Sequence, residues 1–285
     1  MYIYVFICFY IYVFVYNSNI MNYTDYENES PFNVDSFEIN VGDIVWNQLP
    51  PISIITPTEN RKDTFALAIQ NWSNFIYNQE RMEWIIVDTA YDASQKVDTL
   101  LPKDPRIKYV YLHTQSPTAS VSLGWKRNIA NRVATAGTVR IHMDDDDVYS
   151  PLSLLMRIQG LLRHPDCGCV GCNPIAIYDV VHDQSSMLIS PLQCHLPEAS
   201  MAYTEQFWKT RGFYDNATCG ESVAFLEGRE NEVVSIRTRD VITAVNHTRN
   251  TTGEQRTKML NQHEANGCQH PIGVETLQLL KQWYN

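Results

Sequence analysis

The sequence has few basic residues for its length. It contains 22 lysines and arginines against 32 aspartates and glutamates, so the net charge is −10 and the pI is about 5.2. Nucleic-acid binding relies on a broad basic surface that neutralises phosphates, and this charge balance excludes such a partner. An acidic chain that binds an anionic ligand must do so locally, with a few basic groups and a metal ion.

A disulfide framework is also missing. The seven cysteines are odd in number and irregular in spacing, which argues against a secreted fold held together by disulfide bonds. Unpaired cysteines are typical of proteins in a reducing compartment. We therefore predict a cytoplasmic location.

No apolar run is long enough to be a good membrane helix. Residues 1–16 are apolar and aromatic, but a spanning helix needs about 20 apolar residues, and a signal peptide normally begins with basic ones. Met21 offers an alternative start of translation. Residues 1–20 are interpreted as a mis-assigned start, a membrane anchor or a signal peptide, in that order. Membrane association is expected only through residues 1–16.

Strand and helix patterns alternate from Pro51 onward, after a polar and irregular arm at residues 21–50. Apolar, β-branched runs predict strands over 52–58, 82–92, 107–113 and 139–143. Apolar spacings of three and four predict helices over 61–77, 123–135 and 151–163. Such alternation is typical of βαβ units. The sequence therefore predicts an α/β fold with a Rossmann-like, mostly parallel sheet flanked by helices.

The folded part of the chain is expected to divide at about residue 150. Residues 51–150 form the regular half, whereas short strands and turn residues predict a smaller mixed region over 151–255. The closing residues, GVETLQLLKQWYN, have the pattern of an amphipathic helix. They predict a helical tail within residues 256–285.

Four consecutive aspartates at 144–147 follow the apolar residues Val139, Ile141 and Met143. Adjacent like charges repel by roughly 1 kcal/mol per pair even in water, so a cation or open solvent must relieve them. Hard ions such as Mg²⁺ and Mn²⁺ prefer oxygen ligands, and ligands of open α/β sheets bind beyond the carboxyl ends of the strands. A solvated acidic turn is the alternative. The abrupt change from strand to acid favours a metal site.

Other polar groups follow the neighbouring strands. Thr56, Pro57, Thr58 and Arg61 come after the first strand, and Asp88 ends the second. The carboxyl ends of parallel strands meet at one edge of a sheet, so these groups are expected near the acid run. An acid at the position of Asp88 either caps a helix or holds a ribose or a base.

Two basic residues begin the predicted helix in SLGWKRNIA. A helix N-terminus favours phosphate, and nearby cations add to that preference. We interpret Lys126 as a solvated surface charge and Arg127 as a diphosphate contact. Together with the acid run and Asp88, Arg127 predicts a site for a nucleotide diphosphate.

Several motifs of the sequence form an ordered set. They are TPTENR, WIIVDTAYD, GWKRN and MDDDDVYSP, followed by EASMAYTEQFWKTRGFYD, GESVAFLEGRE and VITAVNHTRNTT. In this order they resemble the motifs of the inverting family 2 glycosyltransferases of the GT-A fold. The resemblance spans about residues 51–255. Each motif alone is weak, but the ordered set is specific. It implies transfer of one sugar from a nucleotide-diphosphate sugar, by family frequency a UDP-sugar, to a hydroxyl of a carbohydrate acceptor.

The resemblance also implies roles for the acid run. Its DxD-type motif falls on Asp144, Asp145 and Asp146, with Asp144 at the ribose and Asp146 as ligand of a Mn²⁺ or Mg²⁺ ion. Asp147 matches a further acid that could hold a metal-bound water. Asp145 is assigned to the donor pocket and is expected to be the most dispensable of the four.

The remaining site residues are carried over in the same way. The base pocket falls on Thr56, Thr58, Arg61 and Asp88, and the diphosphate contact falls on Arg127. Glu221 falls on the general base. His247 lies where related folds place a late metal or diphosphate ligand, although a lone histidine is more often a packed or surface residue.

Three positions depart from the family pattern. Glu59 stands where an aromatic or small residue is common, and Thr89 replaces the second acid of the VDD ending. Ser222 follows Glu221 where an aspartate is frequent, which weakens the identification of the base. Glu227 and Glu230 remain alternative candidates for that role.

Two other functions fit parts of the sequence. A haloacid-dehalogenase-like phosphatase also has an apolar strand followed by DxD, but that motif usually opens its domain, whereas here three predicted strands precede it. A non-catalytic carbohydrate-binding module of the same fold is the second alternative. Such a module has no use for a base, so Glu221 argues against it.

Overall fold

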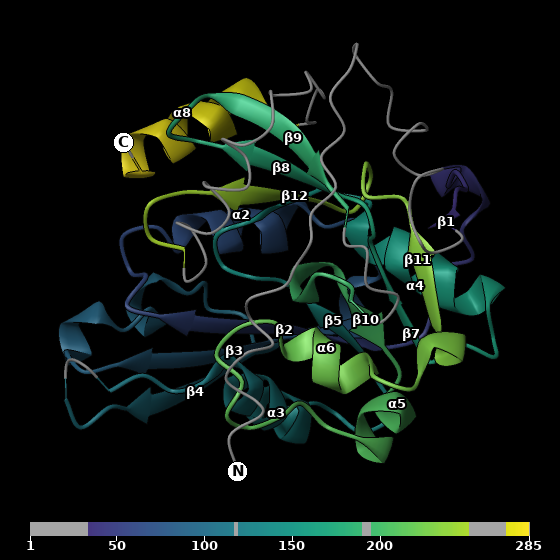
Figure 1. The fold of residues 1–285 in the computed structure, drawn as a ribbon, viewed down its shortest axis with the longest axis horizontal. Helices are drawn as coiled ribbons and strands as arrows, with labels where there is room; N and C mark the ends of the chain where they lie inside the picture. The colour runs from purple at the N-terminus through teal and green to yellow at the C-terminus, as the bar shows by residue number, and fades with distance from the viewer. Residues whose placement is uncertain (1–33, 117–118, 190–194, 251–271, 285) are drawn as a thin grey trace.

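The computed structural model describes residues 34–116, 119–189, 195–250 and 272–284 (Figure 1). The apolar segment at 1–16 and the first part of the C-terminal tail lie outside these ranges. No helix within them is long and apolar enough to span a membrane.

An eight-stranded sheet forms the centre of the described structure. In spatial order its strands are β1 (Val34–Asp35), β11 (Val233–Ile236), β7 (Cys169–Gly171), β10 (Ala202–Tyr203), β5 (Val139–His142), β2 (Ile52–Glu59), β3 (Met82–Ala90) and β4 (Ile107–His113). Only β10 is antiparallel to its neighbours, β7 and β5. The predicted mostly parallel sheet is therefore confirmed.

Helices cover both faces of this sheet (Figure 1). The helices are α2 (Ala66–Asn74), α3 (Leu123–Val133), α4 (Ser153–Arg163), α5 (Glu205–Thr210), α6 (Glu221–Leu226) and α8 (Val274–Tyr284). Ile54 and Ile86 pack in the same cluster as α2 and α4, whereas their neighbours Ile55 and Ile85 pack against α3. Successive strand residues point to opposite faces, so β2 and β3 are buried at nearly every position.

A smaller four-stranded sheet lies beside the first (Figure 1). Its order is β6 (Val148–Tyr149), β12 (Ile242–Asn246), β8 (Ile175–Asp179) and β9 (Gln184–Leu188). β12 runs parallel to β8, while β6 and β9 are antiparallel to their partners. Since β6 begins directly after the acid run, that run joins the two sheets.

Short 3-10 helices complete the structure. They are η2 (Val41–Asp43), η3 (Gln79–Arg81), η4 (Ala93–Gln95), η5 (Asp98–Leu100), η6 (Glu198–Ser200) and η7 (Glu230–Glu232). η6 immediately precedes β10, which places it beside the central strand β5. It contributes to the site described below.

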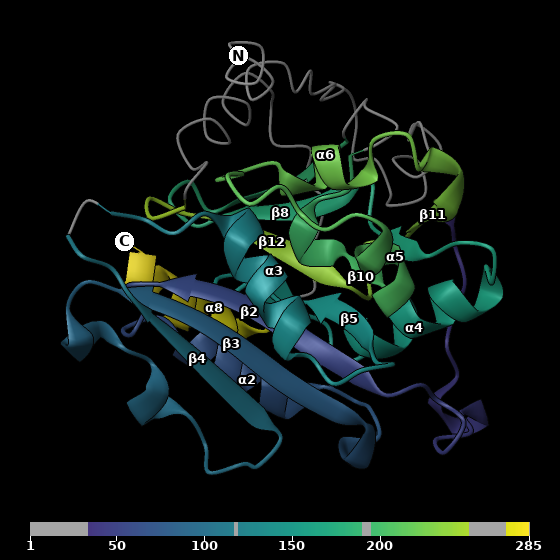
Figure 2. The ribbon, with the colours of Figure 1, turned by 90° about the horizontal axis from the view of Figure 1, so that it is seen from below.

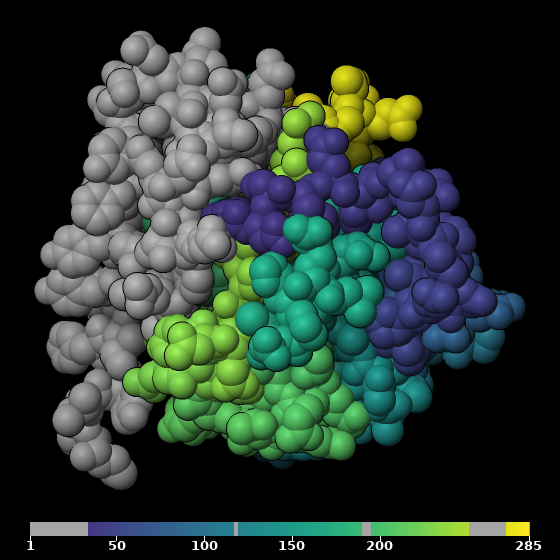
Figure 3. Space-filling model, turned by 90° about the vertical axis from the view of Figure 1, so that its right-hand side faces the viewer, coloured from purple at the N-terminus to yellow at the C-terminus, as the bar shows by residue number. Residues whose placement is uncertain are grey.

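Part of the arm predicted to be irregular packs against the fold. β1 pairs in parallel with β11, and Phe37, Ile39, Ile44 and Trp46 pack against the main core. Figure 3 shows this segment, in purple, lying across the surface of the protein. Phe37, Ile39 and Val41 alternate with polar residues, but this pattern is too short to distinguish a packed segment from an irregular arm.

Close contact between α3 and the loop after α5 leaves no room for a side chain at Gly124. A Cβ there would lie 2.1 Å from the backbone oxygen of Tyr214. We expect Gly124→Ala to destabilise the fold by about 1–3 kcal/mol, as overpacking does, and to lower the melting temperature. Gly273→Ala is the matched control, because its Cβ would meet nothing within 4 Å. Equal melting temperatures for the two variants would contradict this contact.

Candidate active site

A cavity of about 400 Å³ lies where β2, β5 and α3 meet. Its walls come from residues 57–61 at the end of β2, residues 120–123 at the start of α3, and the acid run at 144–146. Lys126, Thr218 and Arg249 complete the lining. The cavity therefore lies beyond the carboxyl ends of parallel strands, where open α/β sheets bind ligands.

The four aspartates of the acid run have different surroundings. Asp144, Asp145 and Asp146 line the cavity, whereas the Oδ1 atom of Asp147 accepts a hydrogen bond of 2.8 Å from the backbone N of Val245. Asp147 is buried and ties the run to β12. The structure thus gives Asp147 a contact within the fold instead of the expected place beside a metal-bound water.

Asp145 is buried at the wall of the cavity. Its carboxylate accepts a hydrogen bond from the Thr58 hydroxyl. Burial, followed by the adjacent charge of Asp146, raises the pKa of Asp145 to about 7. Near neutral pH this carboxyl is therefore partly protonated, which relieves repulsion within the run.

Asp146 is surrounded by polar groups from two other segments. Its Oδ2 atom lies 3.1 Å from His247 Nε2, 3.1 Å from Asn250 Nδ2 and 3.4 Å from Arg61 Nη2. Arg61 follows β2, and the other two follow β12. The structure thus brings Arg61, Asp146 and His247 together as expected. It adds Asn250, which the sequence interpretation did not single out.

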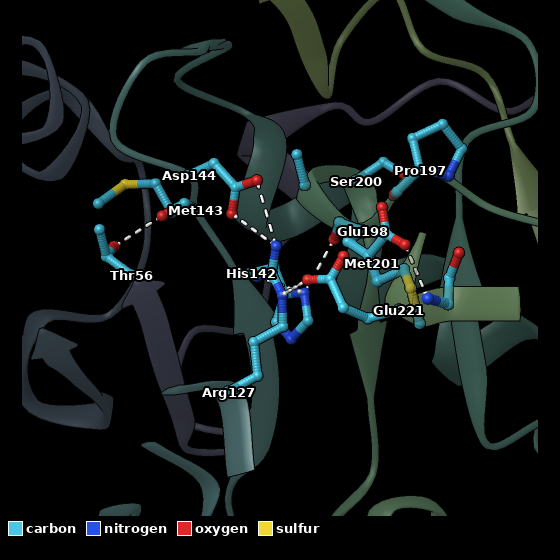
Figure 4. Close-up of polar contacts among 12 residues, drawn as sticks. Thr56, Arg127, His142, Met143, Asp144, Pro197, Glu198, Ser200, Met201 and Glu221 are labelled. Atoms are coloured by element: carbon cyan, nitrogen blue, oxygen red, sulfur yellow. Dashed lines mark hydrogen bonds and ion pairs between the residues drawn. The ribbon is translucent and has the colours of Figure 1, made fainter. Parts of the chain in front are cut away.

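Arg127 is buried beneath the cavity and joins two carboxylates (Figure 4). Its Nε atom lies 3.0 Å from Glu221 Oε1, and its Nη2 atom lies 3.1 Å from Asp144 Oδ1. Its side chain is only 1% exposed, and it does not line the cavity. Arg127 therefore holds Asp144 and Glu221 in place, instead of lying open to a diphosphate as expected from the sequence.

The prediction of a solvated Lys126 is wrong. Its side chain is 1% exposed, and its Nζ atom pairs with Glu59 Oε2 at 2.6 Å and with the backbone oxygen of Thr58 at 3.2 Å. Burying an ammonium ion is costly unless it is paired, so Glu59, noted as a departure from the family pattern, is its counter-ion. Because Lys126 lies three residues into α3, its direction depends on how the helix packs.

Two residues assigned to the base pocket do not line the cavity. Thr56 donates to the backbone oxygen of Met143 at 2.7 Å and accepts from Trp84 Nε1 at 2.8 Å, which ties β2 to its neighbours. Asp88 is fully buried, and its Oδ2 atom accepts from the hydroxyl of Tyr109 at 2.6 Å and from the backbone N of Val97 at 3.0 Å. Pro57, Thr58 and Arg61, which were also expected at the donor site, do line the cavity.

Arg249 is a cavity cation that the sequence interpretation missed. Its Nη1 atom pairs with Asp63 at 2.8 Å, and its Nη2 atom donates to the backbone oxygen of Asn60 at 3.0 Å. Arg61 in turn donates to the backbone oxygen of Arg249 at 2.7 Å. The only signal in the sequence was its place in VNHTRN, two residues after His247.

Glu221 begins α6 and is 2% exposed. Burial, followed by the charge of Glu198, raises its pKa to about 7 against the opposing effect of Arg127. Ser222, where the family often has an aspartate, lies beside it. A carboxyl group with a pKa near 7 suits proton transfer at neutral pH.

Glu198, on η6, is the second carboxylate beside Glu221 (Figure 4). Its side chain accepts a hydrogen bond of 2.7 Å from the backbone N of Ser222, and its backbone oxygen lies 2.9 Å from His142 Nδ1. Burial alone would raise the pKa of Glu198, but His195, that backbone N–H and Arg127 together lower it. Glu198 therefore stays charged. No spacing in the sequence indicated that it meets α6.

The carboxylates in the cavity supply the type of ligand atom that a divalent cation prefers. Mg²⁺ and Mn²⁺ prefer oxygen ligands, and Mg²⁺ is usually held by one or two carboxylates together with substrate phosphates. Asp144 and Asp146 supply such oxygens at the cavity wall. In the part of the chain that the structure describes, no three His, Cys, Asp or Glu side chains converge on one metal position. Water or a bound substrate would have to complete the coordination.

Comparison with known protein families identifies the class to which this chain belongs. The sequence profile of Glycosyl transferase family 2 matches residues 53–228, more than half of the chain. The chain therefore belongs to that family, and the resemblance drawn from its motifs is confirmed. This membership argues against the phosphatase alternative. No match to the chain was found among curated protein sequences.

Two solved structures illustrate the similarity of the fold. The mannosyltransferase PcManGT from Pyrobaculum calidifontis, in complex with GDP-Man and Mn²⁺, has a TM-score of 0.56 and 14% identity, covering 91% of this chain and 75% of that one. S. aureus TarS 1–349, in complex with UDP-GlcNAc, has a TM-score of 0.56 and 13% identity, covering 82% of this chain and 71% of that one. This chain covers 42% of the longer TarS chain. At these identities the similarity shows the fold alone.

Proposed function

We propose that this protein is a metal-dependent, inverting glycosyltransferase that moves one sugar from a nucleotide-diphosphate sugar, with UDP as the leading choice of nucleotide, to a carbohydrate hydroxyl. The observation that carries the proposal is a single cavity that combines the acid run, the start of α3 and the cations Arg61 and Arg249. A nucleotide diphosphate needs this combination of anion-binding groups and metal-binding carboxylates. GDP-Man, Mn²⁺ and UDP-GlcNAc in structures of the same fold support this choice of ligands.

The diphosphate would lie between the start of α3 and the two arginines. A helix N-terminus carries partial positive charge and free N–H groups, and residues 120–123 of the cavity wall include the N-cap, Ser122. Asp144 and Asp146 would hold Mn²⁺ or Mg²⁺, which supplies Lewis-acid stabilisation of the leaving diphosphate when bound. Arg127 contributes indirectly, because it orients Asp144.

Glu221 would accept the proton of the acceptor hydroxyl. As that oxygen bonds to the anomeric carbon, the bond from this carbon to the diphosphate breaks, and a single displacement inverts the configuration. Arg127 donates a hydrogen bond to Glu221 Oε1, which orients the carboxylate. Arginine keeps its own proton, so this contact leaves Glu221 able to accept one. The raised pKa of Glu221, about 7, makes it a competent base near neutral pH.

Metal-dependent nucleotide release tests this proposal. UDP-, GDP- and dTDP-sugars would first be screened by thermal shift with Mn²⁺, and the stabilising donor would then be assayed for release of its nucleoside diphosphate with and without EDTA. Release that requires Mn²⁺ and a carbohydrate acceptor is expected. Phosphate release from simple esters would instead support a phosphatase, and binding without turnover of any donor would favour a non-catalytic module.

Glu198 is expected to set the pH dependence of turnover. Glu221 acts as a base only when deprotonated, so kcat should rise with pH through its pKa of about 7. Glu198→Gln removes the negative charge that helps raise this pKa, and the rising limb of kcat should move to lower pH. Glu80→Gln, an exposed site on η3, is the charge-matched control and should leave the limb in place. An unchanged profile for Glu198→Gln would contradict the coupling.

A further inference from the structure

The C-terminal helix α8 packs against the elements that surround the acid run. Leu280 is fully buried, in a cluster with Leu67 of α2, Tyr178 of β8 and Val245 of β12. Lys281 also pairs with Asp183 at 2.8 Å. The helix lies outside residues 53–228, where the family profile matches. α8 docks beside the proposed donor site (Figure 2).

The last buried residue of α8 contacts the site directly. The ring of Tyr284 stacks on the imidazole of His247, with 3.7 Å between centroids and 8° between the planes. Both side chains are buried. A face-to-face contact this close restricts rotation of the imidazole. The residue that makes this contact lies 37 positions further along the chain. The direction in which His247 points thus depends on α8.

Both ring nitrogens of His247 contact groups of the protein. Nδ1 accepts a hydrogen bond of 3.1 Å from the backbone N of Arg249, because a backbone N–H can only donate. Nε2 lies 3.1 Å from Asp146 Oδ2 and 3.0 Å from Asn250 Nδ2. His247 therefore faces the Asp146 carboxylate through Nε2.

We infer that α8 is a working part of the donor site: Tyr284 orients His247, and His247 orients the Asp146 carboxylate for the divalent cation. His247 is then a positioning residue and not a metal ligand. The inference rests on the proposed function, because it assumes that Asp146 binds the cation. Groups that hydrogen-bond a metal-ligating carboxylate fix its orientation, and losing one typically costs about 10–100-fold in metal affinity or activity.

Mn²⁺ binding without any donor tests the inference apart from turnover. The titration would follow the electron paramagnetic resonance signal of free Mn²⁺ with wild-type protein and four variants. Tyr284→Leu keeps an apolar side chain but loses the aromatic stack, and it should weaken Mn²⁺ binding about tenfold. Tyr284→Phe keeps the ring and should bind as the wild type does. So should Gln282→Ala, at an exposed position in the same turn of α8, while Asp146→Ala defines non-specific binding.

The outcomes separate the inference from the function on which it rests. Equal Mn²⁺ affinities of Tyr284→Leu and wild type would overturn the role of α8 alone. A wild-type titration no tighter than that of Asp146→Ala would overturn the metal assignment itself, and the inference with it. Electron spin echo envelope modulation of Mn²⁺ bound to the wild type gives a second test, which uses no variant and so does not depend on whether a variant folds. No directly coordinated imidazole nitrogen is expected, and finding one would overturn the positioning role of His247.

Discussion

Glu221→Gln should lower kcat by at least about a hundredfold, the usual scale for a lost acid–base group, while donor binding stays close to that of the wild type. Glutamine has nearly the same shape as glutamate but cannot accept the acceptor's proton. Arg127 keeps its contact with Asp144, so the donor side of the site should remain in place. Steady-state kinetics would give kcat, and calorimetry with the donor and Mn²⁺ would give the dissociation constant.

Glu227→Gln and Glu230→Gln are the matched controls for this experiment. Both glutamates are exposed and follow α6, and both remained open as alternative bases from the sequence. They should turn over at nearly the wild-type rate. Normal turnover by Glu221→Gln would show that Glu221 is not the base. A loss confined to one of the control variants would move the role to that residue.

Asp146→Ala should abolish metal-dependent donor binding. The substitution removes the carboxylate on which His247, Asn250 and Arg61 converge, and with it the oxygen ligand proposed for the cation. The measurement is a thermal shift or calorimetric titration with the donor, in Mn²⁺ and in EDTA. The wild type should show a difference between the two conditions, and the variant should show none.

Asp145→Asn is the informative comparison for Asp146→Ala. Asparagine matches aspartate in size, and Asp145 already has a pKa of about 7, so the loss of its charge should change the site far less. Most of the metal-dependent donor binding should therefore remain. Retained binding in Asp146→Ala, or its complete loss in Asp145→Asn, would show that the roles within the acid run are assigned wrongly.

Much of the fold could be predicted because its signals are local. β2 and β3 are rich in apolar and β-branched residues and buried on both faces, and α3 and α4 follow the expected spacing of three and four. Polar residues directly after such strands must lie at one edge of the sheet. That edge holds the cavity.

Local patterns were insufficient where the backbone turns. Asp146 and Asp147 are neighbours in the sequence, yet one lines the cavity and the other bonds to β12. Lys126 and Arg127 are both buried, and only Lys126 lines the cavity. Within a turn or the first turn of a helix, the direction of a side chain depends on what packs against it, and no periodicity records that.

Pairs of residues far apart in sequence were beyond reach for the same reason. Glu198 meets Ser222 across η6 and α6, and Tyr284 stacks on His247, 37 positions away in the sequence. The sequence alone was enough for the family, through its ordered motifs, and for the parallel sheet and the edge that holds the cavity, through its strand and helix periods. Which carboxylates face the cavity, which carboxylates Arg127 holds, and the contact of the C-terminal helix with His247 emerged only from packing in three dimensions.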